Sequence, residues 1–186
     1  MALLKIHAQR GLPLMLAAAL CVLLCMPLCI PIIGRAADLG SADEYRVKAA
    51  FLLNFLKFAQ WPDADGTKDP FVIGVLLPDP FSAELDDAAR AMKISGRRVE
   101  VRRFRKLADV RRCHLLFVPR DADVLGADLA QAGRLTVGET PQFLSAGGII
   151  SFYLQNNQVR FEIDPGAAER AGLRINEHVL QLGARR

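Results

Sequence analysis

The chain has 186 residues, of which 52% are hydrophobic and 24% charged, and its formal net charge is +4. Three of its 24 basic residues and none of its 20 acidic residues precede residue 37, so the charge of the remaining part is near +1. This balance gives no reason to expect a nucleic-acid-binding protein, and the roughly 150 residues after position 36 suffice for one domain with a sizeable core.

The first 36 residues have the three parts of an export signal. A basic start is followed by Leu12 to Ile33, which is apolar without a charge, and small residues flank Arg35 before the expected cut. We therefore expect residues 1–36 to be a cleaved signal peptide and residues 37–186 to be the mature α/β domain. The apolar run is long enough to cross a bilayer, so a retained anchor is the alternative, although its three prolines disfavour a regular spanning helix.

Tyr45 to Gln60 is expected to form a helix with an unusually wide apolar side. An arc of roughly 200°, interrupted only by Lys48, contains Val47, Phe51, Leu52, Phe55, Leu56, Phe58 and Ala59. This side is wider than the apolar stripe of an ordinary surface helix, so a sheet, a partner or a membrane must cover it. We expect that the helix lies mainly on a sheet and forms part of the core.

The middle of the chain alternates short apolar runs with helical segments. Phe71 to Leu77 is continuously apolar and predicts a central strand covered on both faces. Phe81 to Met92 predicts a helix with Ser82 as its cap, and Arg98 to Phe104 alternates valine with charge, as in an exposed or edge strand. The remaining predictions here are a helical stretch at 107–111, strands at 113–118 and 135–137, a helix at 121–132 and a helical turn at 141–146.

Basic residues gather around the predicted edge strand. They are Arg97, Arg98, Arg102, Arg103, Arg105, Lys106, Arg111 and Arg112. We expect a solvated edge that resists self-pairing. An anionic small ligand, anionic lipid head groups or an acidic protein face are the alternatives.

Cys113 is the only cysteine after residue 36, so an intramolecular disulfide cannot form in the mature domain. At the start of an apolar strand it is expected to be a small buried residue, and a disulfide between two chains is the alternative. His114, its neighbour, points to the opposite face of a strand, so it is not expected to activate Cys113 as a nucleophile.

The last third of the chain contains the clearest hairpin signal. Asn156-Asn157 separates the strand-like runs 149–154 and 158–163, and asparagine tolerates left-handed backbone angles. Pro165 suits the first turn of a helix that Gly172 ends. A short connection or strand at 173–176 and a last helical turn or two at 177–182 follow. Together the elements predict a single-domain α/β sandwich. Its mixed, largely parallel sheet of about five or six strands is flanked by helices and ends in an antiparallel hairpin.

The sequence contains no recognisable catalytic or metal-binding pattern. His114 and His178 have no second histidine or cysteine at metal-ligand spacing, and there is no nucleophile elbow or phosphate loop. We therefore predict no catalytic residue, no cofactor, no metal and no enzymatic activity, although an exported enzyme of unknown type remains a third alternative.

Four ordered segments carry a resemblance to a known family. They are Lys48–Phe55 with Lys57-Phe58 and Trp61-Pro62; Ile73–Leu76 with Asp79–Phe81; Leu135–Glu139 with Phe143 and Gly147–Ile150; and Val159–Ile163 with Ala171–Ile175 and Leu180. Across about residues 45 to 182, the chain resembles the YfiR family of exported regulators.

The resemblance implies a periplasmic inhibitory protein with an α/β sandwich fold and a tendency to form homodimers. Such a protein restrains a membrane-bound diguanylate cyclase by binding its periplasmic sensor segment, and its release raises cyclic di-GMP and favours biofilm. Contact with the inner membrane is then expected only through the partner or an uncleaved leader. Two departures limit the transfer: with Cys113 alone there is no intramolecular redox switch, and Asp164-Pro165 stands where relatives commonly have Asn-Leu.

We predict partner contacts on the final hairpin and the segment after it. Arg160 and Glu162 alternate with apolar residues, and Arg174 and Asn176 add polar groups close by. A simple surface ion pair between Glu162 and Arg174 is the non-functional explanation. The alternative function is a periplasmic small-anion-binding sensor or carrier in which Arg160 and Arg174 hold the anion.

Overall fold

The computed structural model describes residues 41–61, 69–122, 124, 129 and 131–185. All of them belong to the second of two compact units into which the chain divides, residues 37–186. The expected signal peptide 1–36 lies outside the described residues, and so does much of the helix predicted at 121–132. Among the helices that the structure describes, none is long and apolar enough to cross a membrane.

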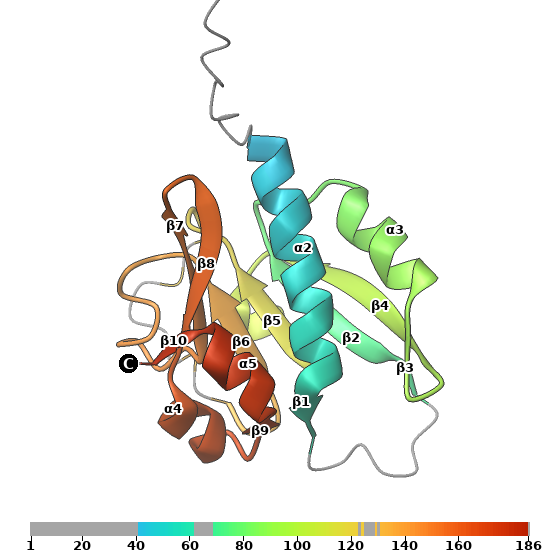
Figure 1. The fold of residues 1–186 in the computed structure, drawn as a ribbon. Helices are drawn as coiled ribbons and strands as arrows, with labels where there is room; N and C mark the ends of the chain where they lie inside the picture. The colour runs from blue at the N-terminus through green and yellow to red at the C-terminus, as the bar shows by residue number, and fades with distance from the viewer. Residues whose placement is uncertain (1–40, 62–68, 123, 125–128, 130, 186) are drawn as a thin grey trace, which may run out of the picture. The chain divides into compact units, whose positions relative to one another are not determined.

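Eight strands form one mixed sheet in the order β10-β8-β7-β6-β5-β2-β4-β3 (Figure 1). The six longer strands are β2 (Phe71–Leu76), β4 (Arg97–Phe104), β5 (Leu115–Val118), β6 (Leu135–Gly138), β7 (Ile150–Gln155) and β8 (Gln158–Ile163). The two-residue strands β3 (Lys93–Ile94) and β10 (Ala184–Arg185) stand at its edges. Pairing is antiparallel in β7–β8 and β3–β4 and parallel elsewhere, which confirms the predicted sheet. The expected number of five or six strands matches the six longer strands but leaves out the two-residue strands β3 and β10.

A second, two-stranded sheet was not expected from the sequence, although a strand at 173–176 was one of the two alternatives there. In it, β1 (Ala59–Gln60) pairs with β9 (Arg174–Ile175) in antiparallel fashion. Because β1 directly follows helix α2 (Ser41–Phe58), this sheet ties the end of α2 to the last part of the chain. The remaining helices are α3 (Glu84–Ala91), the 3-10 turn η1 (Leu107–Asp109), α4 (Pro165–Arg170) and α5 (Glu177–Leu182).

Helix α2 lies across one face of the large sheet, between α3 and α5 (Figure 1). Its Phe55 ring lies 5.8 Å from Phe152 and 5.0 Å from Phe161, centroid to centroid, on the hairpin strands β7 and β8. Burial of each such side chain contributes about 1.5–3 kcal/mol, so this helix is a main source of stability. The expectation that this helix belongs to the core is confirmed. The predicted apolar arc was wrong at two positions, because Val47, which it included, is 37% exposed, whereas Lys48, its interruption, is only 3% exposed.

Strand β2 is central, as predicted, and all six of its residues are buried. Ile73 and Val75 face the core under α2, whereas Val72 and Leu76 face a second core on the other side of the sheet. That second core includes Leu116. Both faces of the sheet are therefore closed to water around β2.

Helix α3 begins later than predicted, and Ser82 does not cap it. Phe81 is buried against Phe117, with ring centroids 4.8 Å apart, so the chain must turn before the helix can start. Ser82 takes part in this turn with a positive φ of 52°, which is unsuitable for a capping residue. Ala83 occupies the cap position and makes no side-chain hydrogen bond there.

The hairpin and the segment after it follow the sequence prediction closely. Asn156 and Asn157 have φ values of 50° and 60°, as a tight primed turn requires. Asp164 caps α4 by accepting a hydrogen bond from the Ala167 amide at 2.9 Å, and Pro165 is the first residue of that helix. Gly172 follows with a φ of 75°, the left-handed conformation that ends many helices.

Arg97 and Cys113 do not fully match the predictions. The basic residues were expected to be solvated, and Cys113 was expected to open a strand. Arg97 is only 7% exposed; its guanidinium lies 3.9 Å from the Phe71 ring centroid and its Nε donates to the Asp69 carbonyl at 2.6 Å. Cys113 precedes β5 rather than opening it, and it is buried as expected. Burial raises the pKa of its thiol, so a disulfide between chains would require local opening.

His114 predicts a measurable pH dependence of stability. Its Nδ1 accepts a hydrogen bond from the Val72 amide at 3.0 Å, and its ring packs edge-on against Trp61 and Phe71. Burial, followed by the charge of Arg97, lowers the pKa of His114 below its ordinary value of 6.5. The unfolded chain therefore binds the proton more readily, and the free energy of unfolding should fall as the pH drops through that value, by at most about 1.4 kcal/mol per pH unit.

Urea unfolding of the protein and of His114→Gln at about pH 7 and about pH 5 tests this. The variant should lose most of the decrease between the two pH values, since glutamine can accept the same hydrogen bond without titrating. The pKa of Asp86 is already below its ordinary value of 3.8, so this carboxylate does not titrate in the window. An equal decrease in both proteins would assign the pH dependence to other groups.

Candidate functional site

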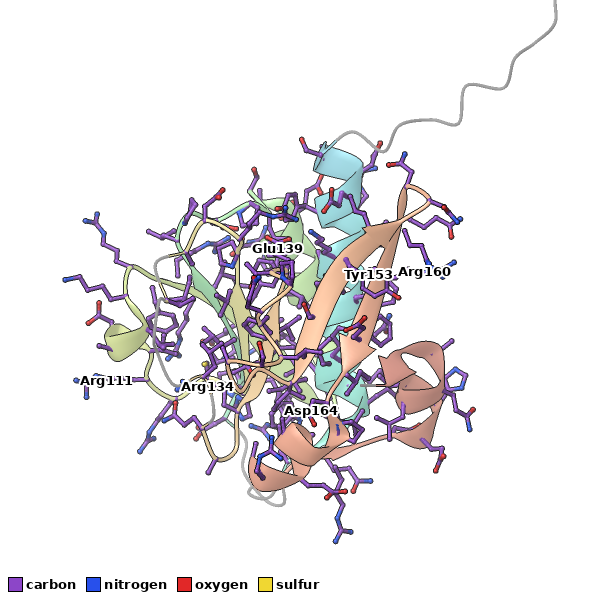
Figure 2. The ribbon with its side chains drawn as sticks, turned by 90° about the vertical axis from the view of Figure 1, so that its left-hand side faces the viewer. Arg111, Arg134, Glu139, Tyr153, Arg160 and Asp164 are labelled. Carbon is purple, nitrogen blue, oxygen red and sulfur yellow. The ribbon has the colours of Figure 1, made fainter. Side chains whose placement is uncertain are left out.

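The outward face of the β7–β8 hairpin carries two of the predicted contact residues. Along β8, Val159, Phe161 and Ile163 are buried, so Arg160 and Glu162 project to the other side of the strand. Arg160 lies opposite Tyr153 of β7, and Figure 2 shows these two side chains close together on the hairpin. Arg160 is exposed, and its Nη2 donates to Gln158 Oε1 at 2.6 Å.

A groove of about 720 Å³ adjoins this face, and we call it the hairpin groove. It is lined by Arg120, Glu139, Pro141, Ser151, Phe152, Tyr153, Leu154 and Glu162. Arg120 and Glu139 follow the carboxyl ends of the parallel strands β5 and β6. Loops at the carboxyl ends of parallel strands are the usual place for binding sites in α/β sheets.

The base of the hairpin groove holds a buried carboxylate. The Glu139 side chain is 2% exposed and forms an ion pair with Lys48 of α2, which is 3% exposed. Glu139 also accepts hydrogen bonds from the Tyr45 hydroxyl at 3.2 Å and from the Arg120 amide at 3.1 Å. Lys48 has a second carboxylate partner in Glu44, one helical turn earlier. These contacts satisfy a pair of charges that would be costly to bury alone.

The strand end before Glu139 is shaped by a glycine. A Cβ atom at Gly138 would come within 2.3 Å of the Phe143 ring, so only glycine fits between β6 and this side chain. Phe143 is 3% exposed and closes the second core below the groove. The position of Glu139 therefore depends on close packing on one side and on α2 on the other.

The Tyr45 hydroxyl belongs to the same cluster, because it interacts with the Glu139 carboxylate. Burial raises the pKa of its hydroxyl well above the ordinary value of 10, and the nearby Glu139 carboxylate raises it further. The hydroxyl consequently stays protonated and donates to Glu139. The arrangement is suited to holding α2 in place rather than to transferring protons near neutral pH.

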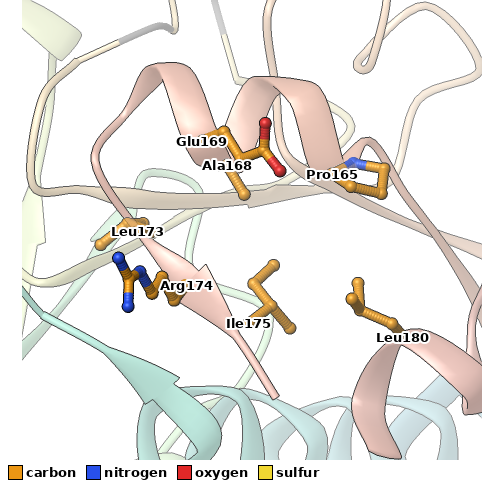
Figure 3. A pocket seen from close by; sticks show the side chains of 7 residues that line it. All are labelled: Pro165, Ala168, Glu169, Leu173, Arg174, Ile175 and Leu180. Atoms are coloured by element: carbon orange, nitrogen blue, oxygen red, sulfur yellow. The ribbon is translucent and has the colours of Figure 1, made fainter. Parts of the chain in front are cut away.

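The other two predicted residues lie beside a separate hollow, which we call the C-terminal pocket. It measures about 520 Å³ and is lined by Pro165, Ala168, Glu169, Leu173, Arg174, Ile175 and Leu180 (Figure 3). Its polar side chains are Arg174 of β9 and Glu169 of α4.

Asn176 stabilises the local structure. Its side chain caps α5 by accepting a hydrogen bond from the His178 amide at 2.8 Å, and its backbone amide donates to the Phe58 carbonyl at 3.2 Å.

The structure thus places the predicted residues in two pairs. Arg160 and Glu162 share the outward hairpin face, whereas Arg174 and Asn176 lie around β9. The suggested ion pair between Glu162 and Arg174 is absent from the ion pairs of the described residues. Arg174 lines the C-terminal pocket and Arg160 does not, so the two arginines do not form a common anion site there.

The buried cluster around Glu139 was not predicted from the sequence. One signal was present, because a lysine inside the apolar arc of a helix implies a buried carboxylate partner. The partner itself could not be identified, since Glu139 is 91 residues away and follows an ordinary strand. In the described part of the chain, no three His, Cys, Asp or Glu side chains are placed to hold a metal ion.

A family described as YfiR/HmsC-like matches residues 45–184, which include every helix and sheet strand described above except the start of α2 and the last residue of β10. No curated protein matches the chain.

The buried pair predicts strong, coupled effects of substitution. Lys48→Met should lower the free energy of unfolding by about 3–5 kcal/mol, because the Glu139 carboxylate loses its charged partner in a buried site. Lys48→Met combined with Glu139→Gln should cost less than the sum of the single changes, since the buried charge at position 139 is removed and only the more exposed Glu44 carboxylate loses its partner. Urea unfolding of the single and double variants measures the coupling.

A matched control lies on the same helix. Arg46 forms an exposed pair with Asp43 at 3.0 Å, so Arg46→Met should change stability by about 0.5 kcal/mol or less. If Lys48→Met were equally mild, the Lys48–Glu139 pair would not be a main constraint on α2.

Proposed function

Because the chain belongs to the YfiR/HmsC-like family, whose members are periplasmic regulators of diguanylate cyclases, we propose that it restrains one such membrane-bound enzyme by binding its periplasmic sensor segment. The observation that carries this proposal is the family match over residues 45–184. The protein then acts by binding, without chemistry of its own, and release of the cyclase raises cyclic di-GMP inside the cell.

The outward hairpin face is the proposed main contact surface. Arg160 and Glu162 offer charges of opposite sign on neighbouring positions, and Tyr153 adds a half-buried aromatic ring beside Arg160. Aromatic and arginine side chains are enriched in protein interfaces.

The underside of this face is rigid, which favours its use in recognition. Phe161 and Phe152 stand opposite each other on the buried side of the hairpin and pack against Phe51 and Phe55 of α2. A partner that binds the outward side chains therefore meets a preformed surface and does not have to order it. Arg174 and Asn176, beside β9, form the second part of the proposed contact region.

Deletion of the gene is expected to raise the cyclic di-GMP content of the cell, because the cyclase loses its inhibitor. Extraction and mass-spectrometric measurement of the nucleotide, with complementation by the intact gene, test this expectation. An unchanged level under several growth conditions would contradict the regulatory role.

The contact surface is tested by charge reversal. Arg160→Glu and Glu162→Arg should each abolish co-purification of the membrane partner and raise cyclic di-GMP toward the deletion level, because opposed charges across an interface become repulsive. Arg174→Glu tests the second part of the region in the same assay. The partner is identified by mass spectrometry of the material that co-purifies from membranes.

Lys57→Glu is the matched control for the hairpin variants, because Lys57 is an exposed cation of α2 and not of the hairpin. It should leave both co-purification and cyclic di-GMP unchanged. If Lys57→Glu released the partner while the hairpin variants retained it, the contact surface would be wrong even though the regulatory function held.

A further inference from the structure

In the described part of the chain, strand β4 has a largely open edge. Strand β4 pairs with β2 from Val99 to Phe104, but on its other side β3 covers only Arg97 and Arg98. No other described strand pairs with β4. The outer edge of residues 99–103 therefore offers backbone groups to a further strand.

The free backbone groups can be assigned from the ladder. The Phe104 carbonyl accepts from the Leu77 amide at 2.9 Å, so Phe104 directs its backbone groups toward β2. Because these directions alternate along a strand, Arg102 and Glu100 also face β2. Val99, Val101 and Arg103 consequently direct their amides and carbonyls outward, away from the sheet.

A shallow groove runs along this edge. It measures about 320 Å³ and is lined by Asp86, Ala89 and Arg90 of α3 and by Val99, Glu100, Val101 and Arg102 of β4. Figure 1 shows that α3 lies next to β4. A helix next to an open strand edge provides a channel in which an extended segment can lie.

The charges at this edge select what can enter. Arg103 is already held by Asp79 and Asp86, and Arg102 by Glu100 at 3.1 Å. At the ends of the edge, four exposed cations have no ion-pair partner among the described residues, and they are Lys93, Arg98, Arg105 and Lys106. Asp79, Asp86 and Glu100 thus each have an arginine partner within the chain, with Arg103 shared by the first two, whereas the four cations have no carboxylate partner.

We propose that the outer edge of β4 binds an extended acidic segment of a partner protein, which joins the sheet as an additional strand beside Val99–Arg103. Outward backbone groups supply the hydrogen bonds, and the four cations attract the acidic side chains. A second copy of this chain fits less well, because edge-to-edge pairing would bring the same uncompensated cations of both copies together. This surface lies outside the hairpin face, so the proposal does not depend on the regulatory function.

The test uses a blocked peptide of alternating glutamate and valine, with a lysine–valine peptide as its charge-reversed control. Fluorescence anisotropy with the purified protein should show binding of the acidic peptide only, and binding should weaken at high ionic strength. In hydrogen exchange followed by NMR, the peptide should slow exchange of the Val101 and Arg103 amides. It should leave Glu100 and Arg102 unchanged, since these already donate to β2.

Backbone pairing is tested on the peptide itself, which leaves the protein intact. N-methylation of the residues that face β4 should abolish binding, whereas methylation of the alternate residues should preserve it. Val101→Pro, which removes an outward amide without touching the β2 ladder, should have the same effect on the protein side. Circular dichroism confirms that this variant is folded.

Charge selection is tested by reversing two of the cations. Arg98→Glu combined with Arg105→Glu should weaken binding of the acidic peptide about tenfold, whereas Arg111→Glu, an exposed cation away from the edge, should change it less than about twofold. Absence of binding, equal binding of the lysine peptide or indifference to N-methylation would overturn the proposal. So would a dimer in analytical ultracentrifugation that Val101→Pro dissociates, because the occupant would then be a second copy.

Discussion

The buried ion pair between Lys48 and Glu139 is the constraint on which the arrangement of the domain depends. It joins the first helix to the carboxyl end of β6 across 91 residues of sequence, in a place where neither charge reaches water. Apolar packing alone would let α2 slide or rotate on the sheet at little cost, since many hydrophobic arrangements have similar energies. The pair adds a specific requirement to this packing, because a displacement of α2 would leave a buried charge without its partner. The Tyr45 hydroxyl and the Arg120 amide donate hydrogen bonds to the same carboxylate and so orient the Glu139 side chain.

The position of α2 in turn determines what the hairpin shows to solvent. Phe55 packs against Phe152 and Phe161, which commits one side of β7 and β8 to the core. Side chains alternate along a strand, so Tyr153, Arg160 and Glu162 must then face outward. A shift of one residue in the hairpin register would bury Arg160, and the tight turn at Asn156 and Asn157 prevents it. The proposed contact surface is thus a consequence of the core on its other side.

Much of this architecture could be predicted from local patterns, whereas the long-range polar contacts could not. The hairpin, the central strand β2 and the capped helix α4 follow from alternation, continuous apolarity and turn residues, each of which acts over a few positions. Lys48 was visible as an interruption of an apolar arc, but nothing in the sequence connected it to Glu139. The pairing of β1 with β9 involves two residues on each side, which is too short for any periodic signal. Ser82 was misassigned as a cap because the burial of Phe81, a tertiary effect, decides the turn before α3.

The two sides of the sheet differ in what a partner can recognise. At the β8 edge, β10 pairs with the last two residues of the strand, Glu162 and Ile163, and the proposed contacts of the hairpin are made by side chains. At the other edge, β3 stops after two residues and β4 offers backbone groups.

Recognition through side chains depends on which residues stand at a few positions, and a single charge reversal can abolish it. Recognition through backbone groups accepts many sequences that are extended, and only the cations around the edge restrict the choice to acidic ones. The two surfaces therefore impose different demands on a partner, and substitutions at one need not affect binding at the other, because β7, β6, β5 and β2 stand between β8 and β4.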